Sequence, residues 1–152
     1  FGKISYVSGN VFDIPAEGQF ELILATEIIE HVAHPDQFLE KLSRLVKKGG
    51  YILITTPLGS YMLNNLPKFT EFENPEIFES VQFKPNSDGH IFLLHKEEVF
   101  FVAERAGLDV VEYETYTNPL TNGHLKTSFL LKIVPENIQL CPKSLKIRVG
   151  AE

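Results

Sequence analysis

The stretch from Phe20 to Pro57, FELILATEIIEHVAHPDQFLEKLSRLVKKGGYILITTP, decides the fold of this protein. It begins with a continuous apolar run, Phe20 to Ala25, whose length suits a buried parallel strand. A second apolar run, Tyr51 to Thr55, follows a segment with helical spacing. A strand, a helix and a strand joined by short loops form a βαβ unit, which predicts a parallel sheet with right-handed crossovers.

The segment between the two runs carries the marks of one amphipathic helix. Pro35 and Asp36 suit its first turn, because proline has no N–H to lose there and a carboxylate interacts favourably with the helix dipole. Lys47 and Lys48 suit its last turn, and the glycine pair at 49–50 supplies a left-handed stop. The apolar residues that share one face are Phe38, Leu39, Leu42, Leu45 and Val46.

Further elements are predicted on both sides of this unit. Residues 4–8 alternate in a β-rich pattern, which predicts a strand that ends at Gly9-Asn10. A second helix is expected to start at His95 and to stop at Gly107, and residues 108–117 alternate like a strand. The last strand could be either residues 128–134 or residues 145–149.

The stretch from residue 58 to residue 89 has a different character. Glutamates alternate there with phenylalanines and prolines, and neither the helical nor the strand period holds for long. We interpret this stretch as an insertion, with one short helix, that lies over the edge of the sheet.

Composition narrows the class of protein. The 152 residues suffice for one domain with a sizeable core. Fourteen Lys and Arg against twenty Asp and Glu give a net charge of −6. This charge argues against a protein whose main role is to bind nucleic acid or the surface of an anionic membrane. A single cysteine, Cys141, cannot form an internal disulfide and fits a reducing cytosol. No apolar run is long enough for a membrane span. A cytoplasmic α/β domain is therefore expected.

The central stretch resembles the class I S-adenosylmethionine-dependent methyltransferases, most closely the branch that contains ubiquinone-biosynthesis O-methyltransferases. The likeness lies in a strand that ends before a Glu-His-Val step, a helix with leucines, a Gly-Gly turn and a strand ending in Thr-Thr-Pro. A later stretch, DGHIFLLHKEEVFFVAERAGLDVVEY, is similar to the helix and strand that follow in that family. The resemblance covers roughly residues 4–116 and implies a Rossmann-like sheet.

The resemblance implies a set of cofactor contacts at the carboxyl ends of the strands. Asn10 occupies the position of a carboxylate that holds the adenine amino group, and the backbone N–H of Val11 would meet the ring. The amide oxygen of Asn10 can still accept a hydrogen bond, although a plain turn asparagine remains the alternative. Ala25, Thr26 and Glu27 would line the cofactor on the opposite side, or simply end a strand.

Two anchors of that family are missing from these 152 residues. The Gly-rich loop after the first strand and the acid that grips the ribose after the second have no counterpart, and no G-x-G-x-x-G occurs. We therefore expect residues 1–152 to be one partial methyltransferase domain that begins near the third strand. We also expect this segment alone to bind S-adenosylmethionine poorly and to be inactive by itself.

Two histidines are the candidates for proton transfer. Methyl transfer is an in-line displacement that needs alignment, exclusion of water and, for a hydroxyl acceptor, removal of a proton. His31 lies just past the predicted cofactor wall, and His90 opens the segment that returns over the sheet; packing or loop-bracing roles are the alternatives. By family analogy, residues 58–89 would form a substrate lid. Its aromatic rings could cover the acceptor or could instead pack onto the core: Tyr61, Phe69, Phe72, Phe78 and Phe83.

A metal-dependent alternative is also open. Glu27, Glu30, His31 and His90 are similar to the metal-binding set of small-RNA 2′-O-methyltransferases, in which a divalent ion polarises a ribose hydroxyl. The same letters are common in relatives that use no metal, and the acidic insertion suits an RNA backbone badly. In the predicted site, none of these four residues is therefore assigned to a metal ion.

Other functions fit the sequence less well. No Tyr-x-x-x-Lys supports a nicotinamide-dependent oxidoreductase, and there is neither a G-x-S-x-G elbow nor a G-K-[ST] phosphate loop. A non-catalytic module that kept the sheet and lost the cofactor loop remains a competing interpretation. The sequence thus predicts a methyltransferase that acts on an oxygen or nitrogen of a small molecule, with the acceptor and the oligomeric state left open.

Overall fold

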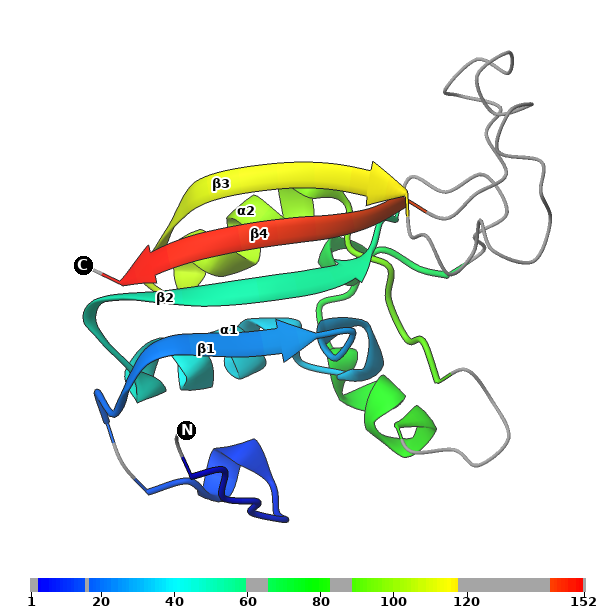
Figure 1. The fold of residues 1–152 in the computed structure, drawn as a ribbon. Helices are drawn as coiled ribbons and strands as arrows, with labels where there is room; N and C mark the ends of the chain where they lie inside the picture. Colours follow the sequence, from blue (N-terminus) through cyan, green and yellow to red (C-terminus); the bar gives the residue numbers. More distant parts are fainter. Residues whose placement is uncertain (1–2, 16, 60–65, 83–88, 118–142, 152) are drawn as a thin grey trace, which may run out of the picture.

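The computed structural model describes residues 3–15, 17–59, 66–82, 89–117 and 143–151, which form a four-stranded mixed sheet with helices on one face (Figure 1). The strands are β1 (Phe20–Thr26), β2 (Val46–Pro57), β3 (Leu108–Thr117) and β4 (Lys143–Ala151), and their order in the sheet is β1-β2-β4-β3. β1 and β2 are parallel, and β4 is antiparallel to both of its neighbours. The predicted α/β class and the parallel β1–β2 pair are confirmed.

Helices α1 (Pro35–Leu45) and α2 (Lys96–Arg105) cover the same face of the sheet. The core lies between them and the strands, where Leu39, Ile52 and Val102 are completely buried. Burying each such side chain stabilises the fold by about 1.5–3 kcal/mol. The predicted start of α2 is confirmed, because His95 is its N-cap and the Glu98 carboxylate accepts a hydrogen bond from the His95 backbone N–H at 2.9 Å.

The predicted end of α1 is wrong. The helix stops at Leu45, and β2 begins at Val46, so Lys47, Lys48 and the glycine pair belong to the strand. Gly49 does have the predicted left-handed conformation, with a φ of 74°, but it lies within β2. The pairing register is irregular there, since Phe20 faces Val46 but Leu22 faces Tyr51. A Cβ on Gly50 would lie 2.8 Å from the Glu21 carbonyl oxygen. The second glycine therefore permits the close approach of two strands.

The predicted amino-terminal strand is also wrong for the described residues. Residues 4–8 have no strand assignment, and Ile4 and Tyr6 are 78 % and 92 % exposed. A strand needs hydrogen bonds from a neighbour, and alternation alone does not supply that neighbour. At the other end, β4 contains residues 145–149, one of the two predicted last strands, whereas residues 128–134 lie outside the described residues.

In the described part of the insertion after β2 there are two short 3-10 helices, η3 (Phe69–Glu71) and η4 (Pro75–Val81), where one helix was predicted for the whole insertion. Three of its aromatic rings pack around the fully buried Phe92, with ring centroids of Phe69, Phe72 and Phe78 at 5.5, 6.4 and 5.0 Å from it. Phe69 is buried in the core, whereas Phe72 and Phe78 are half-buried against it. Tyr61 and Phe83 lie outside the described residues. Among the described residues, no helix has the length and apolar character of a membrane span.

Candidate active site

The candidate site lies where β1 and β2 end, at the same edge of the sheet. The Glu27 backbone N–H donates a hydrogen bond to the Thr55 carbonyl oxygen at 2.8 Å, directly after β1. Glu27 has a φ of 53°, which is a left-handed conformation. Such a conformation is uncommon outside glycine and clusters at functional sites. The chain therefore turns sharply out of the sheet at this residue.

The three residues predicted to line the cofactor occupy different environments. Ala25 is 2 % exposed and belongs to the core, so its side chain cannot form a wall, although its backbone lies at the strand end. Thr26 and Glu27 are exposed at the edge of the sheet. The strand end thus offers two accessible side chains out of the three predicted.

The two residues predicted to contact adenine lie at the start of η1 (Val11–Asp13). Asn10 is the N-cap, and its side-chain oxygen accepts a hydrogen bond from the Phe12 backbone N–H at 3.1 Å. This is the turn role that sequence reasoning kept as the alternative. An amide oxygen has two lone pairs, so the turn leaves acceptor capacity on it. Val11 is half-buried against the core.

Glu30 is the most unusual side chain near this edge, because it is a completely buried carboxyl group. One oxygen, Oε2, accepts a hydrogen bond from the Thr56 hydroxyl at 3.1 Å. The other, Oε1, has no hydrogen-bond partner among the described residues and lies 3.8 Å from His31 Nε2. Burial raises the pKa of Glu30, and the nearby Glu27 charge adds to the rise, while the Thr56 hydrogen bond and His31 oppose it.

His31 and His90 come together from distant parts of the sequence. Their ring centroids are 4.8 Å apart, with the planes tilted by 46°. The backbone N–H of Ile91 donates to the Glu30 carbonyl oxygen at 2.8 Å, which fixes His90 beside the η2 helix (Ile29–His31). Gly89 is required for this approach, because its φ is 72° and a Cβ would lie 3.2 Å from His31 Nδ1. The structure therefore brings the two predicted catalytic histidines into one pair.

The same residues have the chemistry of a cation site. One ligand atom from each of Glu30, His31 and His90 lies within 4.8 Å of the others. A carboxylate and two imidazoles are donors that transition metals accept, and the unpartnered Glu30 Oε1 is available to such an ion. Glu27, the fourth member of the sequence pattern, is not part of this cluster.

The predicted cofactor and catalytic residues did not include Glu30 or Thr56, although Thr56 belongs to the strand end at residues 55–57, one of those expected to face a ligand. The Glu-Ile-Ile-Glu-His spacing signalled Glu30 only as part of the metal alternative, and nothing in the sequence indicated that its partner would be Thr56. Helical position cannot show that a carboxyl group is buried, because that depends on which element packs over it.

Sequence and structure comparisons agree on the class. The α/β fold, with the strand order β1-β2-β4-β3, is similar to that of solved methyltransferases. An S-adenosylmethionine-dependent methyltransferase from Mesorhizobium loti superposes with a TM-score of 0.61. That structure is 11 % identical over 95 % of this chain and 68 % of its own, so it shows the fold alone. Residues 4–113 match the sequence model of the family described as "Methyltransferase domain". The chain therefore belongs to this family, and the predicted class I methyltransferase is confirmed.

Parts of the chain are similar to curated methyltransferases. The mitochondrial ubiquinone biosynthesis O-methyltransferase of Dictyostelium discoideum is 45 % identical over 47 residues, which are 31 % of this chain and 15 % of that protein. The ubiquinone biosynthesis O-methyltransferase of Rickettsia prowazekii (strain Madrid E) is 26 % identical over 118 residues, 63 % of this chain and 46 % of that protein. The matches thus span less than half the length of either relative.

Proposed function

We propose that this chain takes part in the transfer of a methyl group from S-adenosylmethionine to an oxygen or nitrogen of a small molecule. The observation that carries this proposal is the His31–His90 pair, 4.8 Å apart at the edge of the sheet where ligands bind in open α/β folds. S-adenosylmethionine supplies an electrophilic methyl group on a sulfonium. An imidazole nitrogen of the pair would accept the proton that the acceptor O–H or N–H loses when its oxygen or nitrogen takes the methyl group, and the sulfonium would leave as a neutral thioether.

Cofactor contacts are proposed for the residues at the strand ends. The Asn10 amide oxygen and the Val11 N–H would hold the adenine, and the Ala25 backbone with Thr26 and Glu27 would line the methionine side. The lone pair left on the Asn10 oxygen and the exposure of Thr26 and Glu27 support this assignment.

We further propose that the chain is the distal part of a longer methyltransferase domain, with residues 58–89 as its substrate lid. Three observations support the partial character of the domain. There is no G-x-G-x-x-G among the 152 residues, the matched stretches cover less than half of the curated relatives, and Leu22 and Leu24 of β1 are 54 % and 60 % exposed. A cytoplasmic location remains a prediction from the cysteine content.

The test compares the 152-residue chain with a form extended by the upstream coding sequence. We expect the extended form to bind S-adenosylmethionine and not NADH in calorimetric titrations, and the shorter chain to bind neither measurably. His31→Asn and His90→Asn in the extended form should lower kcat for a phenolic or amine acceptor by about 10²–10⁴-fold, with binding of S-adenosylmethionine unchanged. An extended form that binds no S-adenosylmethionine would favour the non-catalytic module.

A second candidate is a metal-dependent form of the same reaction, favoured by the Glu30–His31–His90 cluster. These three residues would hold a divalent ion, which as a Lewis acid would make an acceptor hydroxyl more acidic. Co²⁺ titration of the chain, followed by visible absorption, tests this directly. Site binding should be lost in Glu30→Gln and His90→Asn and retained in His95→Asn; equal spectra for all the variants would exclude the metal-dependent form.

A further inference from the structure

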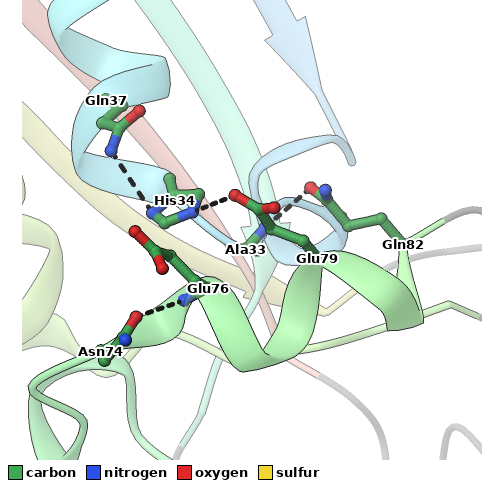
Figure 2. A network of polar contacts seen from close by, with 7 residues as sticks. All are labelled: Ala33, His34, Gln37, Asn74, Glu76, Glu79 and Gln82. Carbon is green, nitrogen blue, oxygen red and sulfur yellow. Dashed lines mark hydrogen bonds and ion pairs between the residues drawn. The ribbon is translucent and has the colours of Figure 1, made fainter.

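Two side chains of the described insertion, residues 66–82, reach the start of α1 (Figure 2). Gln82 Oε1 accepts a hydrogen bond from the Ala33 backbone N–H at 2.9 Å. Glu79 Oε1 lies 2.9 Å from His34 Nε2. Ala33 and His34 follow closely after His31 in the sequence, so both contacts attach η4 to the chain segment that carries one of the paired histidines.

His34 has a polar neighbour at each of its ring nitrogens (Figure 2). Its Nε2 lies 2.9 Å from Glu79 Oε1, and its Nδ1 lies 3.4 Å from Gln37 Nε2. An imidazole ring can donate from one nitrogen and accept at the other, so it can serve both neighbours at once. His34 therefore bridges α1 and η4.

The Gln82 side chain supplies the hydrogen-bond acceptor for a buried backbone N–H, that of Ala33. Ala33 is completely buried, and its N–H precedes the first turn of α1, where no helical acceptor exists. A buried backbone N–H that loses its acceptor is strongly disfavoured. This makes the Gln82 contact specific: only a side chain with an oxygen at the same reach can replace it.

The contacts on the two sides of His90 converge on one short stretch. Before His90, Gln82 is attached to Ala33; after it, the N–H groups of Ile91 and Phe92 donate to the Glu30 carbonyl oxygen at 2.8 and 3.4 Å. Residues 30–33 thus contact both η4 and the stretch that follows His90. The Ile91 and Phe92 contacts place His90, and the Gln82 contact fixes Ala33, two residues after His31.

A cavity of about 220 Å³ lies beside these contacts, lined by Phe12, Val32, His34, Gln37, Glu79 and Gln82. The polar contacts of the insertion are therefore separate from its aromatic contacts, in which Phe72 and Phe78 pack against Phe92. A substitution that removes the polar contacts leaves the aromatic residues of the insertion unchanged.

We propose that Gln82 and Glu79 are positioning residues: together they form a latch that fastens η4 to Ala33 and His34 and so holds His31, which precedes them, against His90. The catalytic importance of the His31–His90 pair rests on the proposed function. The latch rests only on the contacts above, so an experiment can contradict either proposal without the other.

The experiment follows the His31 and His90 rings of the chain by NMR. We expect a nuclear Overhauser effect between the two rings in the unaltered chain, given the 4.8 Å between their centroids. Gln82→Leu should abolish it and make the η4 amides exchange about tenfold faster. Gln82→Glu keeps an acceptor oxygen at the same reach and should restore both signals, which a general packing defect would not allow.

A matched pair of glutamates on η4 provides the control. Glu79→Ala removes the contact with His34, whereas Glu76→Ala makes the same change at an exposed carboxylate on the same helix. Only the first should weaken the ring–ring effect. If Gln82→Leu does not fold, as judged from β2 amide protection, the Glu79→Ala result decides. A ring–ring effect unchanged in Glu79→Ala and in any folded Gln82→Leu would overturn the latch. An intact latch without methyl transfer in the extended form would overturn only the proposed function.

Discussion

The two faces of the sheet differ sharply in how well they are covered. On the face under α1 and α2, Ile52 and Ile54 of β2 are 0 % and 1 % exposed. On the opposite face, Leu22 and Leu24 of β1 are 54 % and 60 % exposed, and Tyr51 of β2 is 40 % exposed. Figure 1 shows both helices on one side of the strands. Residues that alternate along the same strands thus have opposite environments.

This difference teaches what a continuous apolar run can and cannot indicate. Residues 20–25 were predicted to form a buried strand, since both of its faces are apolar. The strand exists and pairs with β2 as predicted, but only Ala25 is buried. The apolar run indicates that both faces of β1 are suited to burial. Whether each face is buried depends on which other elements cover it.

The largest expected difference in the free energy of unfolding is between two variants, each of which truncates one side chain on one face of the sheet. Ile54→Ala should lower the free energy of unfolding by about 2–5 kcal/mol, because it leaves a cavity under the helices. Leu24→Ala should lower it by less than about 1 kcal/mol, because the side chain is already in contact with water. Urea denaturation of the two variants measures the difference; equal losses would mean that the outer face is covered in solution.

An intermediate effect is expected at Gly89, where the covered side of the sheet meets the histidine pair. Gly89→Ala places a Cβ 3.2 Å from His31 Nδ1 in a left-handed residue, whereas Gly18, also left-handed with φ +58°, has nothing within 4 Å of an added Cβ. Gly18→Ala should lower the free energy of unfolding by about 1–2 kcal/mol through backbone strain alone. Gly89→Ala should lower it further and shift the His31 ring signals in NMR spectra. Equal destabilisation with unmoved His31 signals would contradict the close contact.

The smallest change in stability is expected on the outer face itself. Leu22→Lys and Leu24→Lys together should change the free energy of unfolding of the unextended chain by only about 0.5 kcal/mol. The same pair should reduce binding of the dye ANS, because an apolar patch is lost. In the extended form the double variant should be strongly destabilised if further segments cover this face; tolerance there would argue against the proposed partial domain.

Much of the architecture could be predicted because it rests on local patterns. The apolar run that opens at Phe20, Pro35 in the first turn of α1 and the capping pair His95–Glu98 each specify an element through backbone chemistry within a few residues. The predictions were wrong where the structure of a segment depends on a partner that is distant in the sequence. The alternation of residues 4–8 found no strand to pair with among the described residues. Gly50 lies in β2, where it permits a close approach to Glu21 of the neighbouring strand, and not at a helix end.

The candidate site divides in the same way. His31 and His90 could be selected from their places beside a strand end and before a helix. Their pairing, the burial of Glu30 against Thr56 and the attachment of Gln82 to Ala33 could not, since each joins residues that lie far apart in the sequence. Contacts of that range carry no periodic signal in a single sequence.

The sequence by itself determined the class: a βαβ unit, a second helix and strand, and a family pattern that the match over residues 4–113 confirms. It did so because hydrophobic period, caps and turns are properties of neighbouring residues. Only the tertiary structure decided which face of β1 is covered, which carboxyl group is buried and which histidines meet. Those features depend on packing between distant segments, where burial and the satisfaction of polar groups are settled by the whole fold and not by any one stretch of it.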